Sequence, residues 1–159
     1  MGNYKDLEFE FIERSLALIS QYEGIATGFD FKEQYNYTLL INCLLGLIVM
    51  PKERIISYIP QERLTQEFKK GIGLENSKVN GDIKNLKELI IALRHSIAHF
   101  DIKVESHNKK FLIDEIVFMD NSNSRDYEIV RFKANELLPF INYYSGWLMD
   151  NLKKYRRNS

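Results

Sequence analysis

The sequence is poor in the features that mark several classes of protein. Cys43 is the single cysteine among 159 residues, so an internal disulfide is excluded and a reducing compartment is the natural setting. The 22 basic and 22 acidic residues cancel, which excludes a strong overall positive charge as the basis of nucleic-acid binding. Any binding of this kind has to depend on a local group of residues.

Long hydrophobic runs are also missing. The longest run, residues 39–50, contains Asn42 and ends before Pro51, whereas a membrane-spanning helix needs about 20 apolar residues. The first residues mix charged with apolar side chains, unlike a secretory signal. We therefore expect a cytoplasmic protein with no membrane partner.

Several familiar catalytic motifs are absent as well. The sequence has no glycine-rich phosphate loop, no cysteine pair for zinc, and no nucleophilic serine in a strand–turn–helix setting. We expect neither a cofactor nor a bound metal, and the candidate chemistry has to come from ordinary side chains.

The most regular hydrophobic pattern lies in residues 82–100. Asp82 follows Asn80 and Gly81, which break the chain, and is the expected N-cap of a helix. Steps of three and four between apolar residues predict an amphipathic helix with one buried stripe. The stripe consists of Ile83, Leu86, Ile90, Leu93 and Ile97.

Two of the three histidines lie at the far end of this predicted helix, beside an arginine. With about 100° between successive residues, His95 and His99 fall opposite the apolar stripe, in line with Glu88. Arg94 lies about 40° from the centre of the stripe. A permanent charge at that position needs either an exposed head group or a partner.

The remaining pattern predicts helices on both sides of this segment and strands after it. Expected helical segments are residues 4–22, ending at Gly24, residues 32 or 33 to 51, the short pieces 53–58 and 61–68, and residues 134–156, whose expected N-cap is Asn135. Residues 69–81 are expected to form a mobile connecting loop. Three alternating runs, beginning near residues 102, 111 and 127, predict short strands.

These elements give a mainly α fold. A chain of this length with 45% apolar residues suits one domain, residues 1–159. The expected architecture is a helical bundle with a small antiparallel β-meander, at about residues 101–132, inserted before the C-terminal helix.

The chemistry of the histidine-bearing face has three interpretations. His95 and His99 have the spacing of a helical metal pair, but Ser96 follows His95 where zinc proteases have glutamate, and a third ligand would have to be Glu88 or His107. Without a metal, a histidine can transfer protons near neutral pH and an arginine can bind phosphate, which is what RNA cleavage requires. On residue chemistry alone, a solvated polar face with Arg94 in a structural ion pair is the simpler interpretation.

The string RHSIAH, residues 94–99, is an R-x4-H motif at the C-terminal end of a late helix. In this the chain resembles the HEPN superfamily (higher eukaryotes and prokaryotes nucleotide-binding domains). The segment NCLLGLIVMPKER, residues 42–54, followed by the motif helix, strands and a closing helix, is similar to a small bacterial HEPN subfamily found on plasmids and in mobile-element settings. The resemblance covers about residues 37–152, and the strand insertion departs from the minimal helical form.

The resemblance implies a homodimer in which two motifs face each other across a cleft. It further implies a metal-independent endoribonuclease, acting on RNA as a toxin or in phage defence, with a cognate antitoxin as a further partner. By position, Arg94 would bind the scissile phosphate, His99 would handle protons, and His95 would orient these groups. The alternative is a non-catalytic HEPN module that binds nucleotide, RNA or protein.

Overall fold

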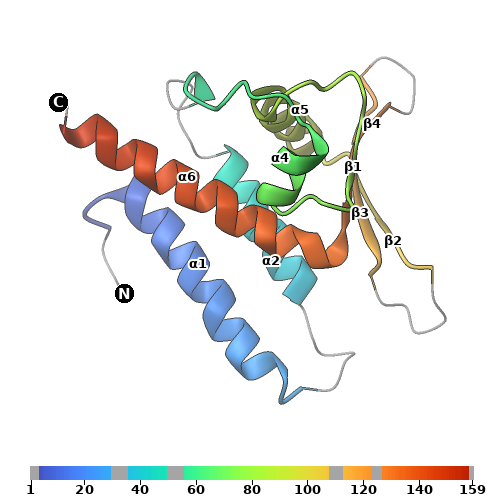
Figure 1. Ribbon diagram of the computed structural model, residues 1–159. Helices are drawn as coiled ribbons and strands as arrows, with labels where there is room; N and C mark the ends of the chain where they lie inside the picture. The colour runs from blue at the N-terminus through green and yellow to red at the C-terminus, as the bar shows by residue number, and fades with distance from the viewer. Residues whose placement is uncertain (1–3, 30–35, 50–55, 108–112, 123–126, 158–159) are drawn as a thin grey trace.

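The computed structural model of the protein describes residues 4–29, 36–49, 56–107, 113–122 and 127–157 (Figure 1). Its helices are α1 (Leu7–Ala26), α2 (Asn36–Val49), α4 (Gln66–Gly71), α5 (Leu86–Ala98) and α6 (Leu137–Arg157). Its strands are β1 (Lys78–Val79), β2 (Ile102–Glu105), β3 (Glu115–Asp120) and β4 (Tyr127–Lys133). A mainly helical chain with a small antiparallel sheet is therefore confirmed.

The helix that carries the RHSIAH string, α5, lies between the other helices and the sheet (Figure 1). It contacts α2 on one side and β3 and β4 on the other, while α1, α2 and α6 contact one another. The buried residues of α5 are Leu86, Leu89, Ile90, Leu93 and Ser96. Because α5 is covered on two sides, its position depends on packing against both α2 and the sheet.

The start of α5 differs from the prediction for residues 82–100. Its N-cap is Asn85, whose side chain accepts a hydrogen bond from the Glu88 backbone N–H at 2.9 Å. The Glu88 carboxylate accepts hydrogen bonds from the Asn85 side chain at 2.8 Å and from the Lys84 backbone N–H at 2.6 Å. The prediction that Asp82 is the N-cap is wrong. Its backbone N–H donates to the Asn80 side chain, within a turn that precedes the helix.

The bounds of α1, α2 and α4 also differ from those predicted. The α1 helix begins after Asp6, which caps Phe9, and continues through Gly24 to Ala26, so Gly24 does not end it. The predicted start of α2 at residue 32 or 33 lies outside the described residues, as do residues 53–55 of the piece 53–58. The α4 helix begins after residue 65 because the Thr65 hydroxyl accepts a hydrogen bond from the Phe68 N–H.

The C-terminal helix begins three residues later than expected. A 3₁₀ turn, Ala134–Glu136, precedes α6, and Lys133 rather than Asn135 is the residue before that turn. Pro139 then lies in the first turn of α6, where its missing N–H leaves no hydrogen bond unmade. The core side is confirmed, since its predicted residues are all buried: Leu137, Phe140, Ile141, Tyr144, Leu148 and Leu152.

The segment predicted as a loop, residues 69–81, is instead anchored at two points. Residues Lys78–Val79 form β1, which pairs with β4. Glu136, itself buried, accepts hydrogen bonds from the backbone and side chains of Asn76 and Ser77. Burial opposes the charge of Glu136, but these donors outweigh it and lower the pKa of the carboxyl.

The sheet has the order β1-β4-β3-β2, with antiparallel pairing throughout. Its inner face carries an edge-to-face aromatic pair and packs on α6 through a tilted aromatic contact. Phe132 lies between Phe118 and Phe140, with ring centroids 5.6 and 5.3 Å away. Burial of such rings is among the largest stabilising contributions in a domain of this size. In the described part of the chain, no helix has the length and apolar composition to cross a membrane.

We predict that Gly73→Ala lowers the free energy of unfolding by about 1–3 kcal/mol. Gly73 has a φ of 81°, and an added Cβ would lie 2.7 Å from Pro139 Cβ and 2.9 Å from the Phe140 backbone nitrogen. Urea denaturation followed by circular dichroism measures the change. The matched control is Gly71→Ala, since a Cβ there meets nothing within 4 Å. Equal stability of the two variants would contradict the prediction.

Candidate functional site

The RHSIAH string ends in a tight backbone motif that closes α5. The Phe100 N–H donates to the Ile97 carbonyl at 3.1 Å, and the Asp101 N–H donates to the Ser96 carbonyl at 2.9 Å. This is the Schellman arrangement, which needs a left-handed residue after the C-cap. Phe100 occupies that position with a φ of 55°, although glycine would adopt it at lower cost.

The two histidines of the string lie together at this end of the helix. His99 is the C-cap, and its ring centroid is 4.5 Å from that of His95. Nε2 of His95 is 3.6 Å from Oδ1 of Asp120, the last residue of β3. The same Nε2 is buried and has no hydrogen-bond partner in the described part of the chain. The histidine pair is therefore flanked by a carboxylate that the sheet supplies.

Arg94 faces a different side of α5. Its half-buried side chain lines a pocket of about 260 Å³ together with Lys87 and Ile91 of the same helix, and with Ile56 and Ser57. Two cations at the wall of one pocket favour an anionic ligand such as a phosphate.

The charge of Arg94 is close enough to the buried Tyr144 hydroxyl of α6 to affect the pKa of that hydroxyl. Burial raises the pKa of the Tyr144 hydroxyl, and the Arg94 charge opposes that shift. The hydroxyl has no hydrogen-bond partner among the described residues. Arg94 thus lies at the boundary between the core and the pocket.

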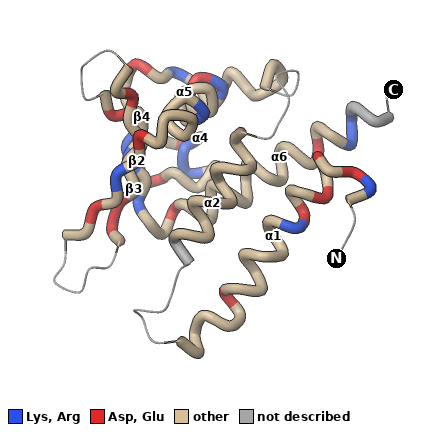
Figure 2. Tube along the Cα trace, turned by 180° about the vertical axis from the view of Figure 1, so that it is seen from behind, with Lys and Arg blue, Asp and Glu red and all other residues tan. Residues whose placement is uncertain are grey.

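The structure brings His95 and His99 together and directs Arg94 elsewhere. Arg94 and His99 are five residues apart, which corresponds to about 140° around one helix. Across the molecule, basic and acidic residues are interspersed over the elements (Figure 2). No broad basic face is apparent among the described residues, so the pocket at Arg94 is a local feature.

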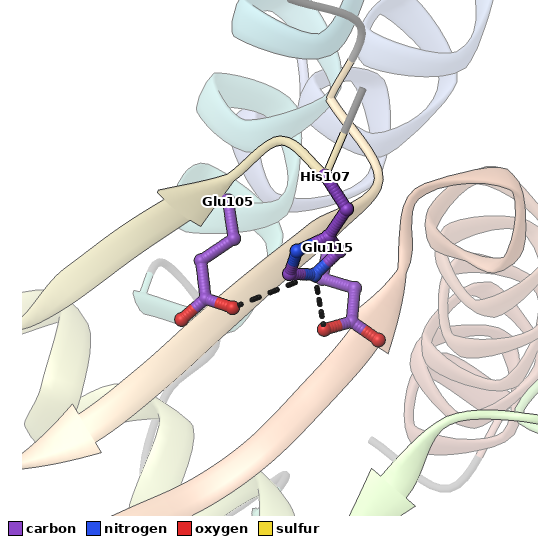
Figure 3. Close-up of side chains that lie close together, drawn as sticks. All are labelled: Glu105, His107 and Glu115. Carbon is purple, nitrogen blue, oxygen red and sulfur yellow. Dashed lines mark hydrogen bonds and ion pairs between the residues drawn. The ribbon is translucent and has the colours of Figure 1, made fainter. Parts of the chain in front are cut away.

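His107 lies apart from the other histidines, in a cluster with Glu105 and Glu115 on the sheet (Figure 3). Its Nε2 is 3.4 Å from Glu115 Oε2 and 3.8 Å from Glu105 Oε2. Among the described residues these three form the one group of three or more metal-ligand side chains. His107 therefore does not complete a metal site with His95 and His99.

Two basic residues already form ion pairs with the carboxylates of this cluster. Arg131 donates to Glu105 at 2.5 Å and to Glu115 at 2.8 Å, and Lys133 donates to Glu115 at 2.6 Å. A metal ion would have to displace Arg131 from both carboxylates and would meet its charge. The cluster is better described as a clamp that joins β2, β3 and β4.

The clamp was missed in the sequence, although its signal was present. Glu105, Glu115 and Lys133 are directly opposite one another in the strand register. Alignment of the three predicted strands would have placed these charges side by side. Asp120 carried no such signal, because its proximity to His95 depends on how α5 packs on the sheet.

We predict that Glu115→Gln destabilises the protein at neutral pH and that the difference from the unsubstituted protein disappears in acid. Hydrogen bonds from Lys133 and Arg131 lower the pKa of Glu115 to about 2. The stabilisation is thus complete above the ordinary pKa of 4.5 and is lost as pH falls towards 2. Thermal unfolding of both proteins between pH 7 and pH 2 provides the measurement. A difference independent of pH would contradict this origin.

Comparison with known proteins gives one match. The family model described as HEPN pEK499 p136 matches residues 1–155. No curated protein and no solved structure matches the chain. The match confirms the resemblance inferred from RHSIAH and extends it to the N-terminal helix. The chain belongs to the HEPN pEK499 p136 family, a HEPN-type family from a plasmid element.

Proposed function

We propose that the protein is a metal-independent endoribonuclease whose active site is completed across a homodimer. The observation that carries the proposal is the division of the R-x4-H string between two surfaces of α5. Arg94 and Lys87 supply a cationic pocket, and His95 with His99 supplies groups able to transfer protons. These are the components that RNA cleavage needs in the absence of a metal.

The chemistry assigns one role to each group. A histidine removes the proton of the 2′-hydroxyl, and the 2′ oxygen attacks the phosphorus. The bond from phosphorus to the 5′ oxygen breaks, and that oxygen receives a proton from a second group, which acts as the acid. Arg94 stabilises the charge on the phosphorane, and His99 handles protons with His95 beside it. The products are a 2′,3′-cyclic phosphate and a 5′-hydroxyl.

The dimer follows from the separation of Arg94 and the histidines. Two copies that meet at α5 can bring Arg94 of one protomer towards His99 of the other. Exposed apolar residues flank the string: Ile91 is 49% exposed and Phe100 is 76% exposed. Apolar side chains beside a polar site are suited to contact between copies. The chain would act as a single domain.

The biological setting that we propose is a toxin or phage-defence effector. The support is the plasmid origin of the matching family. Such an enzyme would need control by a cognate antitoxin or by a trigger. A non-catalytic module that binds nucleotide, RNA or protein through the same residues is the alternative, and the cleavage assay below separates the two.

We predict that the purified protein cleaves RNA in the presence of EDTA and that Arg94→Ala and His99→Ala each reduce the rate by about 10²–10⁴-fold. His107→Ala is the control, since its ring lies in the sheet clamp rather than at the string. Gel analysis of a labelled RNA, with detection of the cyclic phosphate, measures the reaction. Circular dichroism checks that each variant is folded. Undiminished cleavage by His99→Ala would overturn the proposal, and RNA binding without cleavage would favour the alternative.

We further predict that mixing the two inactive variants restores activity. A heterodimer of Arg94→Ala with His99→Ala retains one site that has Arg94 from one protomer and His99 from the other. With free exchange of subunits, about a quarter of the original rate should return. The control mixes Arg94→Ala with the variant that carries both Arg94→Ala and His99→Ala. Dimers of these two chains contain no intact site. Failure to regain activity in exchanged dimers would exclude a composite site.

A further inference from the structure

The end of β3 is tied to the last turn of α5. The Met119 N–H donates to the Asp101 carbonyl at 2.8 Å, and the Asn121 side chain donates to the Asp101 carboxylate at 3.0 Å. Asp101 is in turn the last residue of the Schellman motif that closes the helix. Asp120, between Met119 and Asn121, is therefore held next to the histidine-bearing end of α5.

The Asp120 carboxylate has a defined orientation. Its Oδ1 accepts a hydrogen bond from the Ser122 N–H at 2.9 Å, which fixes the side chain to its own turn. The same oxygen lies 3.6 Å from Nε2 of His95. This distance is slightly longer than a hydrogen bond, and a small movement of either side chain would close it.

Nε2 of His95 needs such a partner. The atom is buried and has no hydrogen-bond partner in the described part of the chain, although 42% of the side chain as a whole is exposed. A buried polar nitrogen without a partner is costly. The carboxylate of Asp120 is the acceptor that faces it, and the exposed remainder of the ring faces outwards.

We propose that Asp120 is a positioning residue for the histidine pair: its carboxylate accepts the Nε2 proton of His95 as a hydrogen bond and so sets the orientation and tautomer of that ring. This inference rests on the proposed function for its catalytic consequence. A proton kept on Nε2 leaves Nδ1 as the free base of the neutral ring. His95 then becomes an oriented proton acceptor or donor beside His99, and the strand insertion becomes part of the active site.

The other charged and titratable groups around this point agree with that role. The His99 ring is the neighbour within α5, and Tyr127 is opposite Asp120 in the strand register. Tyr127 is linked to Asp82, and burial together with the Asp82 and Asp120 charges raises the pKa of its hydroxyl. Tyr127 therefore stays neutral near pH 7 and adds no second negative charge beside Asp120. Arg94 faces the pocket on the other side.

The nearby histidines affect the pKa of the Asp120 carboxyl in the expected direction. The hydrogen bonds from Ser122 lower the pKa of the Asp120 carboxyl, and the proximity of His95 and His99 lowers it further. Asp120 is thus ionised at neutral pH. Its removal would take away the acceptor that faces Nε2 of His95.

The test compares Asp120→Asn with Asp114→Asn in the full-length protein. Both substitutions remove one negative charge. Asp114 immediately precedes β3 and Asp120 is its last residue, so the two positions lie at opposite ends of a strand about 20 Å long at ~3.4 Å per residue. In Asp120→Asn, we expect 15N NMR to show that the neutral His95 ring no longer carries its proton predominantly on Nε2. We expect cleavage to fall about tenfold or more with little change in KM. Asp114→Asn should leave both unchanged, and Asp120→Glu should restore part of the rate.

The two readouts separate this inference from the proposed function. If the unsubstituted protein fails to cleave RNA, the ribonuclease proposal fails, while the NMR measurement of the tautomer still decides whether Asp120 acts on His95. An unchanged tautomer of the His95 ring in Asp120→Asn would overturn the inference, whatever the activity. A tautomer that changes equally in Asp114→Asn would also overturn it, because the effect would then not be specific to Asp120.

Discussion

The burial of α5 on two sides is the constraint on which the rest of the structure depends. Leu89, Ile90 and Leu93 are completely buried where the helix contacts α2 and the sheet. Two separated polar surfaces are left at its C-terminal end. One presents Arg94 to a pocket, and the other presents His95 and His99 to the end of β3. The same packing that stabilises the helix therefore keeps the cation and the proton-transfer groups of one chain apart.

Much of the helical part of the fold could be predicted, because periodic burial is a local property of the sequence. The core side of α6 and the buried Leu86, Ile90 and Leu93 of α5 follow from steps of three and four, whereas the buried Leu89 and Ser96 were not predicted. Helix ends were predicted less well, since they depend on single hydrogen bonds such as that from Glu88 to Asn85. The two-residue strand β1 has no alternation of its own, and it exists because β4 offers it an edge.

The candidate site likewise has one part that could be predicted from the sequence and one part that could not. The R-x4-H string is contiguous, so Arg94, His95 and His99 could be recognised directly in the sequence, and helical spacing already placed the two histidines side by side. Asp120 could not be found, because it is 25 residues from His95 along the chain and reaches that ring through tertiary packing. The β-strands, which first looked like an addition to a helical family, thus contribute a side chain to the histidine-bearing end of α5.

The left-handed Phe100 has a consequence for the dynamics of this region. The last turn of a helix normally frays, and a histidine at the C-cap would then sample many orientations. Here the reversal at Phe100 and the bonds between Ser96 and Asp101, in both directions, hold that turn closed. A group that contacted His99 would therefore meet a turn that has little conformational entropy left to lose. The backbone strain at Phe100 accompanies a preorganised end of the helix.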